Sequence, residues 1–230
     1  IWIGVRQNKH LCGIATIKIF TPDECTDIIK SALSSWTEKE GTILDGKEIT
    51  DWRNVTLFSP PEVVKKSVWF QKIINTIISF NNDKEGYGFD ITGMFEPPSM
   101  LRYMASDINP NKKDGKYDWH IDLGYSPTTS MRKISYSILL NTGEYEGGEL
   151  EFHIGGSEHV SSKDHDFLTD RANSLSDNVE QFKATRSQQS GPEALGSIIL
   201  FPSYLVHRVR PITKGTRYAI VGWMSGNAFK

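Results

Sequence analysis

The sequence is poor in several features that would indicate common classes of protein. Its 230 residues include only two cysteines, Cys12 and Cys25, which supply neither a disulfide framework nor a zinc-binding spacing. A reducing, cytoplasmic location is therefore expected, although a chain that begins at Ile1 rather than Met leaves a removed leader open. No apolar run approaches the roughly 18 to 20 residues of a membrane-spanning helix, so we expect no membrane partner.

An excess of charge of one sign is also lacking. The 26 basic and 28 acidic side chains give a formal net charge of −2 at pH 7. No stretch combines a basic stripe with interleaved aromatic residues, which is the pattern of proteins that bind single-stranded nucleic acid. We therefore expect no nucleic-acid partner.

Apolar residues, in contrast, are plentiful enough for a large core. Hydrophobic residues make up 38% of the chain and aromatic residues 11%. This length suits one large or two small domains, and a β-barrel of this length is often a single domain. We expect a single domain over residues 1–230. Its helical support region covers 1–86, and its β-rich core covers 87–230 with an inserted loop at 155–195.

The N-terminal region carries the signals of a strand and two helices. An apolar run at 11–20 predicts a strand, and residues 21–24 (TPDE) predict a helix that starts with a capping box. Residues 59–61 (SPP) are expected to open a second helix, and residues 81–83 (NND) to close it. Both helices show apolar stripes but no chemistry, so we expect them to support a sheet.

From residue 87 onward, short strand-like segments alternate with turn signals such as Lys214-Gly215. Short strands with this spacing favour a β-sandwich or jelly roll over βαβ units. Two polar loops interrupt the pattern, at 105–116 and 155–195. The longer loop is either a lid over a bound substrate or an unordered segment. The expected strands lie at 89–92, 99–104, 117–123, 134–141, 149–153, 197–201, 205–209 and 217–224.

The most informative stretch is residues 117–123 (YDWHIDL), in which apolar and polar side chains alternate strictly. A period of two predicts a strand with His120 and Asp122 on its polar face. An imidazole and a carboxylate at this spacing supply two ligands of a 2-His-1-carboxylate iron site. An ordinary amphipathic strand with a surface His and Asp gives the same pattern. Asp118 shares this face, where it either orients His120 or meets solvent.

The missing histidine is expected near the C-terminus. His207 lies on one face of a predicted strand, and a turn around Ile212 leads into the next strand at 217–224. Because this hairpin is nearly symmetric, we expect His207 and Arg217 to lie opposite each other on adjacent strands. Taken by itself, Arg217 is better explained as an ordinary strand arginine that pairs with a surface acid.

Together these residues have a chemical use. An iron held by His120, Asp122 and His207 keeps three adjacent coordination positions free for a bidentate co-substrate and dioxygen. A 2-oxo acid occupies two of these positions with its carboxylate and its keto oxygen. Its second carboxylate then needs a cation further along the cavity, and the forked guanidinium of Arg217 suits that role.

A combined signature consists of His120-x-Asp122, residues 207–223 (HRVRPITKGTRYAIVGW), residues 147–152 (GGELEF) and residues 100–103 (MLRY). This combination resembles the 2-oxoglutarate- and Fe(II)-dependent dioxygenases, and most closely their prolyl 4-hydroxylase-like, PKHD-type branch. The resemblance covers residues 87–226 and extends more loosely to the predicted helix at the N-terminus.

The resemblance implies a double-stranded β-helix, or jelly roll, with N-terminal supporting helices. It implies that His120, Asp122 and His207 are iron ligands and that Arg217 anchors the distal carboxylate of 2-oxoglutarate. Either Tyr103 or Tyr117 then contacts the co-substrate, because the loop between them is longer than is usual in the family. Trp223 is either a wall of the cavity or part of the core.

The activity implied by the resemblance is hydroxylation of an unactivated C–H bond, with Fe(II) as cofactor and 2-oxoglutarate and O₂ as co-substrates that yield succinate and CO₂. Ascorbate is expected to support this activity. Asp122 favours hydroxylation over halogenation, because halogenating relatives lack this carboxylate. The favoured reaction is prolyl 4-hydroxylation of a peptide or protein substrate.

Three alternatives are compatible with parts of this pattern. The first is a hydroxylase of a free amino acid or another small molecule. The second, from a different class, is a non-catalytic metal-binding jelly-roll module, and Arg217 argues against it because metal binding alone needs no 2-oxoglutarate anchor. A nucleic-acid demethylase of the same fold is disfavoured because the basic stripe is missing. His153, His159 and His165 match no zinc spacing, so a second metal site is not expected.

Overall fold

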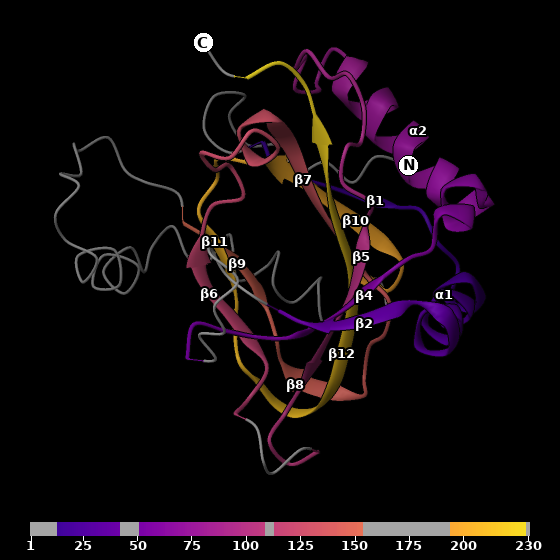
Figure 1. Cartoon of the computed structure of the whole chain (residues 1–230), viewed down its shortest axis with the longest axis vertical. Coiled ribbons are helices and arrows are strands. Elements are labelled where there is room, and N and C mark those ends of the chain that lie inside the picture. Colours follow the sequence, from indigo (N-terminus) through magenta and orange to yellow (C-terminus); the bar gives the residue numbers. More distant parts are fainter. Residues whose placement is uncertain (1–12, 42–50, 109–112, 154–193, 229–230) are drawn as a thin grey trace, which may run out of the picture.

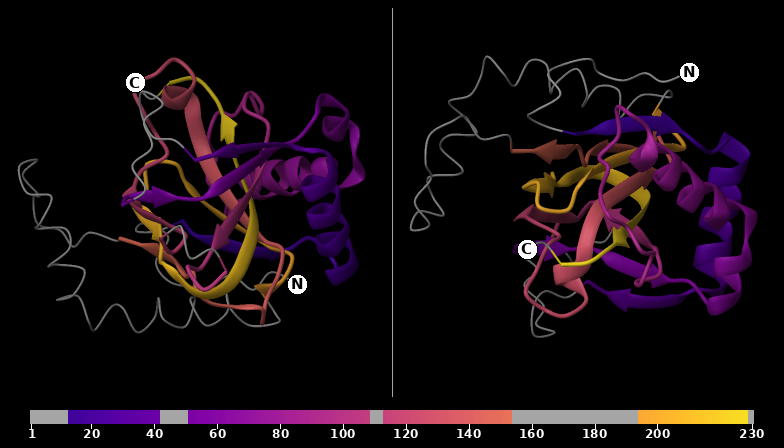
Figure 2. Two further views of the ribbon diagram at one scale, coloured as in Figure 1. Left: turned by 60° about the horizontal axis from the view of Figure 1, so that its bottom comes forward. Right: turned by 90° about the horizontal axis from the view of Figure 1, so that it is seen from above.

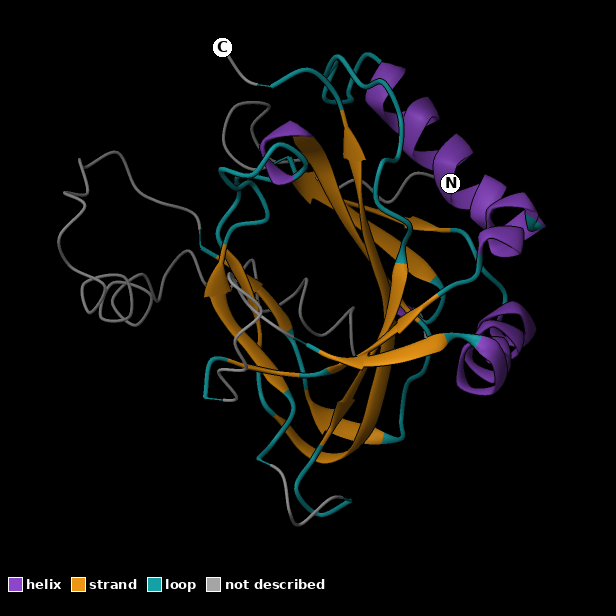
Figure 3. Ribbon diagram, in the orientation of Figure 1, coloured by secondary structure: helices purple, strands orange, loops and turns teal. Residues whose placement is uncertain are grey.

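A computed structural model describes residues 13–41, 51–108, 113–153 and 194–228. Two antiparallel sheets face one another, and two helices pack against the outside of the larger sheet (Figures 1 and 2). Strands dominate the described part of the chain (Figure 3). The predicted mainly β jelly roll with N-terminal supporting helices is confirmed.

The larger sheet has the strand order β1-β10-β7-β12-β5-β4-β2, with β8 paired to β12, and the smaller sheet has the order β3-β6-β11-β9. The strands are β1 (Ala15–Lys18), β2 (Thr37–Glu40), β3 (Arg53–Asn54), β4 (Thr56–Ser59), β5 (Ser99–Met104), β6 (Lys116–His120), β7 (Arg132–Leu139), β8 (Tyr145–Gly147), β9 (Leu150–Phe152), β10 (Ser197–Pro202), β11 (His207–Val209) and β12 (Ile212–Ser225). The helices are α1 (Pro22–Ser35), α2 (Val68–Asn82) and the short 3-10 turns η2 (Glu62–Lys66) and η3 (Thr129–Met131).

Side-chain alternation on the larger sheet produces two cores. On β10, Ile198 and Leu200 pack toward α1 and α2, whereas Ile199 and Phe201 point into the space between the sheets. All four side chains are buried. Because successive residues of a strand face opposite sides, an unbroken apolar run is what a strand covered on both faces requires. The inner core carries the site described below.

The start of α1 was predicted correctly, and the start of α2 was not. Thr21 and Glu24 form the expected capping box, with the Thr21 side chain accepting a hydrogen bond from the Glu24 amide. The expected start of the second helix, at residues 59–61, instead ends β4 and leads into η2. Ser67 provides the side-chain cap from which α2 begins, and no side-chain cap is present at Pro61. The predicted end holds, because α2 stops at Asn82.

The expected strand at 89–92 is absent from the structure. The backbone of Phe89 bonds to the side chain of Asn81 in both directions, at 2.9 Å each, and Thr92 donates to the carbonyl of Ser225. These partners replace a neighbouring strand, and only Gly93 makes an isolated bridge. The N-terminal region is also more than a helical support, because β1, β2 and β4 belong to the larger sheet and β3 to the smaller one.

The expected hairpin between His207 and Arg217 is wrong. The strand β11 lies between β6 and β9 in the smaller sheet, whereas β12 lies between β7 and β5 in the larger one. The chain therefore crosses from one sheet to the other at residues 210–211. The residue opposite Arg217 is Tyr103 on β5. The long β12 strand satisfies its backbone groups with three strands of the larger sheet, which a local symmetry around Ile212 does not reveal.

Two further predictions concern segments that the structure describes only in part. The inserted loop expected at 155–195 lies outside the described residues apart from its last two positions, and so do residues 109–112 of the loop between β5 and β6. Within the described residues, none of the helices has the length and apolar character needed to cross a membrane.

Candidate metal and co-substrate site

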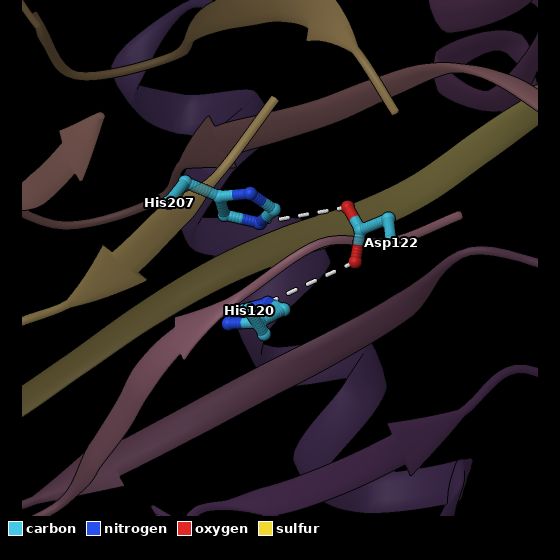
Figure 4. Close-up of side chains that lie close together, drawn as sticks. All are labelled: His120, Asp122 and His207. Atoms are coloured by element: carbon cyan, nitrogen blue, oxygen red, sulfur yellow. Dashed lines mark ion pairs between the residues drawn. The ribbon is translucent and has the colours of Figure 1, made fainter. Parts of the chain in front are cut away.

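Two histidines and one aspartate converge at one end of the space between the sheets (Figure 4). His120 is the last residue of β6 and His207 the first of β11, and the two are direct partners in the ladder. Asp122 lies two residues beyond β6. Its carboxylate oxygens lie 3.8 Å from Nε2 of His120 and 3.5 Å from Nε2 of His207. Among the described residues, this is the only group of His, Cys, Asp or Glu close enough to share a metal ion.

Backbone carbonyls fix the orientation of both imidazoles. Nδ1 of His120 lies 2.7 Å from the carbonyl oxygen of Asp118, and Nδ1 of His207 lies 2.8 Å from that of Leu205. A carbonyl oxygen only accepts, so each Nδ1 carries a proton, which in a neutral imidazole leaves the lone pair on Nε2. Both Nε2 atoms face Asp122. Asp118 orients His120 through its backbone carbonyl, in line with one of the two alternatives expected from the sequence. The carboxylate of Asp118 takes no part in this contact, since it is 37% exposed and lies near Lys116.

Asp122 is held from several directions although it lies beyond the end of a strand. Its backbone amide donates to the carbonyl of Ser203 at 3.0 Å. Its carboxylate accepts a hydrogen bond from the Ser135 hydroxyl at 2.7 Å and another from the indole of Trp223. Ser135 and Trp223 are direct partners on β7 and β12. The larger sheet thus positions the carboxylate, while the smaller sheet positions both imidazoles.

A β-bulge changes the faces that the alternation at 117–123 predicted. Val209 pairs with Tyr117 and His207 with His120, so three residues of β6 span the distance of two residues of β11. Tyr117 consequently lies on the same face as His120, and their rings stack with centroids 3.5 Å apart. The strand also ends at His120 rather than at residue 123. The bulge re-aims His120 toward His207 and leaves Asp122 free to turn inward.

The protonation of His120 and Asp122 matches what a divalent metal requires. Burial, reinforced by the neighbouring imidazole of His207, lowers the pKa of His120 to about 3, so the His120 imidazole is neutral near pH 7. Burial by itself would raise the pKa of Asp122. Interactions with the two imidazoles and hydrogen bonds from Ser135 and Trp223 nevertheless hold this pKa below its usual value. Two imidazoles whose Nε2 atoms face one ionised carboxylate form the donor set of a 2-His-1-carboxylate site, so the residues fit such a metal.

Arg217 is a buried cation deeper in the same interior. Its side chain is 5% exposed, and its guanidinium carbon lies 5.6 Å from the centre of the Tyr103 ring. It also hydrogen-bonds to the hydroxyl of Tyr145, a residue that the sequence did not single out. Within the described part of the chain, no carboxylate forms an ion pair with Arg217. Because a buried charge without a counter-ion is costly, this site fits a carboxylate ligand.

Gly148 leaves the space that the arginine occupies. Its φ of +71° belongs to the left-handed region, and a Cβ at this position would lie 2.8 Å from Cδ of Arg217. Gly147, with φ +80°, ends β8. The Gly-Gly-Glu motif therefore spans the end of β8 and the short connection to β9 rather than the interior of a strand.

The two tyrosines take different places. Tyr103 is fully buried beside Arg217, and burial raises its pKa to about 12, so its hydroxyl remains a hydrogen-bond donor. The charge of Arg217 partly offsets the rise in the pKa of Tyr103, and Asp122 adds to that rise. Tyr117 instead stacks on His120 and lies under the guanidinium of Arg53, whose carbon is 4.5 Å from the ring centre.

His153 is not part of the group of three converging side chains. His153 follows β9 and makes an edge contact with Trp119, with ring centroids 6.2 Å apart. His159 and His165 lie outside the described residues. Ser135 and Tyr145 were missed, because a serine and a tyrosine on ordinary strands carry no local signal of their partners.

This protein is a jelly roll with two histidines and an aspartate between its sheets. Among protein classes, the non-haem iron enzymes match this fold and this ligand set best. Comparison with known proteins specifies the family. The profile of the 2OG-Fe(II) oxygenase superfamily matches residues 100–225, which is more than half of the chain. The chain belongs to the 2OG-Fe(II) oxygenase superfamily.

Individual relatives agree with this assignment. A PKHD-type hydroxylase of Synechococcus sp. (strain CC9605) is 28% identical over 128 residues, which cover 55% of this chain and 44% of the relative. A PKHD-type hydroxylase of Prochlorococcus marinus is 30% identical over 118 residues, which cover 51% and 39%. The chain thus spans less than half the length of these curated relatives.

A solved structure shows the same fold over nearly the whole chain. It is a prolyl hydroxylase from Trichoplax adhaerens in complex with a hypoxia inducible factor oxygen degradation domain peptide fragment. The TM-score is 0.60 and the identity 19%, over 93% of this chain and 83% of that one. At this identity the likeness concerns the fold alone.

Proposed function

We propose that this chain is an Fe(II)- and 2-oxoglutarate-dependent dioxygenase domain that hydroxylates an unactivated C–H bond, with His120, Asp122 and His207 as the iron ligands. The observation that carries the proposal is Arg217. A metal-binding module needs only the three ligands, whereas this interior also holds a buried cation without a carboxylate partner among the described residues. A co-substrate with a second carboxylate explains both features.

The chemistry supplied by bound Fe(II) with 2-oxoglutarate and O₂ is the oxidative decarboxylation of the co-substrate and the transfer of one oxygen atom to a C–H bond. The residues of the chain position and protect these groups. The guanidinium of Arg217 donates paired hydrogen bonds to the distal carboxylate of 2-oxoglutarate. Tyr103 donates its hydroxyl proton as a hydrogen bond to the same co-substrate, and the apolar inner core around it excludes water.

Tyr103, rather than Tyr117, is the proposed co-substrate tyrosine. It lies opposite Arg217 in the β5–β12 ladder and is 1% exposed. Tyr117 has a different task, since its ring packs flat against the His120 imidazole and restrains its rotation. We propose that Trp223 contributes through its hydrogen bond to Asp122, in addition to its expected place as a cavity wall or as part of the core.

The proposed substrate is a proline residue in a peptide or protein. The matching relatives are named PKHD-type hydroxylases, and the Trichoplax adhaerens neighbour holds a peptide fragment. A free amino acid or another small molecule is the second candidate, because the low identities transfer no substrate. We propose that ascorbate supports activity by keeping the iron ferrous.

The substrate proposal is tested with anaerobically purified protein, Fe(II), 2-oxoglutarate, ascorbate and O₂. Proline-containing peptides are compared with matched peptides in which alanine replaces proline, and with free amino acids, and mass spectrometry detects the gain of one oxygen atom. We expect the gain on proline peptides only, and none with His207→Ala protein. A gain on free amino acids alone would replace the peptide substrate by the small-molecule one.

A further inference from the structure

Arg132, the first residue of β7, contacts three features around Asp122. Its Nη1 donates to the backbone carbonyl of Asp122 at 3.0 Å. Its guanidinium carbon lies 3.6 Å from the centre of the Trp223 ring, and the same indole hydrogen-bonds to the Asp122 carboxylate. Its Nε and Nη2 donate to the two carboxylate oxygens of Glu96, at 2.6 and 2.5 Å. One planar side chain therefore fixes both the backbone and the side-chain partner of Asp122.

Asp122 depends on such contacts because no ladder holds it. The strand β6 ends at His120, and Asp122 follows in a bend whose amide is bound by the carbonyl of Ser203. The two imidazoles, in contrast, belong to paired strands and bond to backbone carbonyls. Of the three proposed ligands, the Asp122 carboxylate is thus the one whose orientation depends on side chains of other strands.

The geometry of Arg132 matches this task in each of its contacts. A guanidinium has five N–H donors in a rigid plane, so it can bond to a carboxylate and a carbonyl while one face lies on an indole. The side chain of Arg132 is 13% exposed and that of Glu96 is 24% exposed, so this pair is more ordered than a surface ion pair.

We propose that Arg132 is a positioning residue that sets the metal affinity of the site by holding Asp122 and Trp223 in place. This inference rests on the proposed function, since it takes Asp122 as a ligand. Partners that orient ligands without touching the metal typically change metal affinity by about 10- to 100-fold. Arg132→Met, which removes the charge and all four contacts, is expected to lie in this range.

The test measures metal binding without turnover. Anaerobic titrations with Fe(II), and with Co(II) followed by its visible absorption, give the dissociation constant and the ligand geometry of each variant. Arg132→Lys keeps a positive charge but lacks the planar fork that bonds to both oxygens of Glu96 and to the Asp122 carbonyl, so we expect intermediate affinity. A shifted Co(II) spectrum in Arg132→Met is expected as well, since the carboxylate changes its direction.

Arg102→Met is the matched control. Arg102 also pairs with a glutamate, Glu38, at 2.7 Å and lies 5.0 Å from the centre of the Phe58 ring, yet it contacts none of the three ligands. We expect this variant to bind metal as tightly as the wild type. Equal metal affinities for wild type and both Arg132 variants would overturn the inference, and so would an equal loss in Arg102→Met. A wild-type protein that binds no metal would overturn the proposed function and this inference together.

Discussion

Replacing Arg217 by methionine tests the co-substrate site, because methionine has a similar length and no charge. The guanidinium is 5% exposed, lies beside Tyr103 and Tyr145, and has no carboxylate partner among the described residues. If 2-oxoglutarate supplies that carboxylate, the substitution leaves a buried anion without its cation.

Truncating one partner of a buried, hydrogen-bonded charge pair costs about 2 to 5 kcal/mol of binding free energy. At about 1.4 kcal/mol per factor of ten, the dissociation constant of 2-oxoglutarate should rise by about 30-fold to a few thousand-fold. The stability of the ligand-free protein, in contrast, should not decrease. Removing an unpaired buried charge relieves its desolvation cost, so the melting temperature without ligand should hold or rise.

The assay is anaerobic calorimetry of 2-oxoglutarate binding to Fe(II)-loaded protein, with thermal unfolding measured in parallel. Arg217→Lys keeps the charge but loses the fork, so its affinity should lie between wild type and Arg217→Met. Arg102→Met, on the neighbouring strand with its side chain against Glu38 and Phe58, should leave the affinity unchanged. An unchanged affinity in Arg217→Met, or a loss of affinity that only follows a loss of stability, would refute the assignment.

Three more predictions concern single positions. His207→Ala should abolish Fe(II) binding in a metal titration, and wild-type affinity in this variant would show that the ligand set is wrong. Gly148→Ala places a Cβ 2.8 Å from Cδ of Arg217 at a φ of +71°, so unfolding measurements should show a loss of about 1–3 kcal/mol, together with weaker 2-oxoglutarate binding. The hydrogen bond from Lys72 is the main cause of the lowered pKa of Glu24. The ionised carboxylate therefore stabilises the fold above about pH 4.3, the usual pKa of a glutamate, and this stabilisation is lost as the pH falls through the lowered pKa. Glu24→Gln should therefore cost under about 1 kcal/mol near pH 7 and nothing in acid, and a cost that persists in acid would show that the charge is not responsible.

Features that depend on residues close together in the sequence were predictable. The capping box at Thr21 and Glu24 follows from a four-residue pattern, and the structure shows it. The pair His120 and Asp122 is also local. The candidate ligand His207 lies in a distant segment, so sequence spacing could not connect it with His120 and Asp122. The combination of several family motifs made that connection.

Features set by distant partners were not predictable. The strand β12 forms its hydrogen bonds with β5, β7 and β8, which are distant in the sequence. The hairpin expected between His207 and Arg217 is therefore absent. The segment at 89–92 does not form the expected strand, because the side chain of Asn81 hydrogen-bonds to the backbone of Phe89. Ser135 and Trp223 reach Asp122 from the opposite sheet, and the bulge in β6 depends on its pairing with β11.

The most direct measurement of the central assignment is succinate formation by the anaerobically purified chain after addition of Fe(II), 2-oxoglutarate and O₂. We predict succinate in proportion to the 2-oxoglutarate consumed, a requirement for Fe(II), and none from His207→Ala protein. Protein that binds Fe(II) and 2-oxoglutarate but forms no more succinate than His207→Ala, with or without proline peptides, would contradict the assignment.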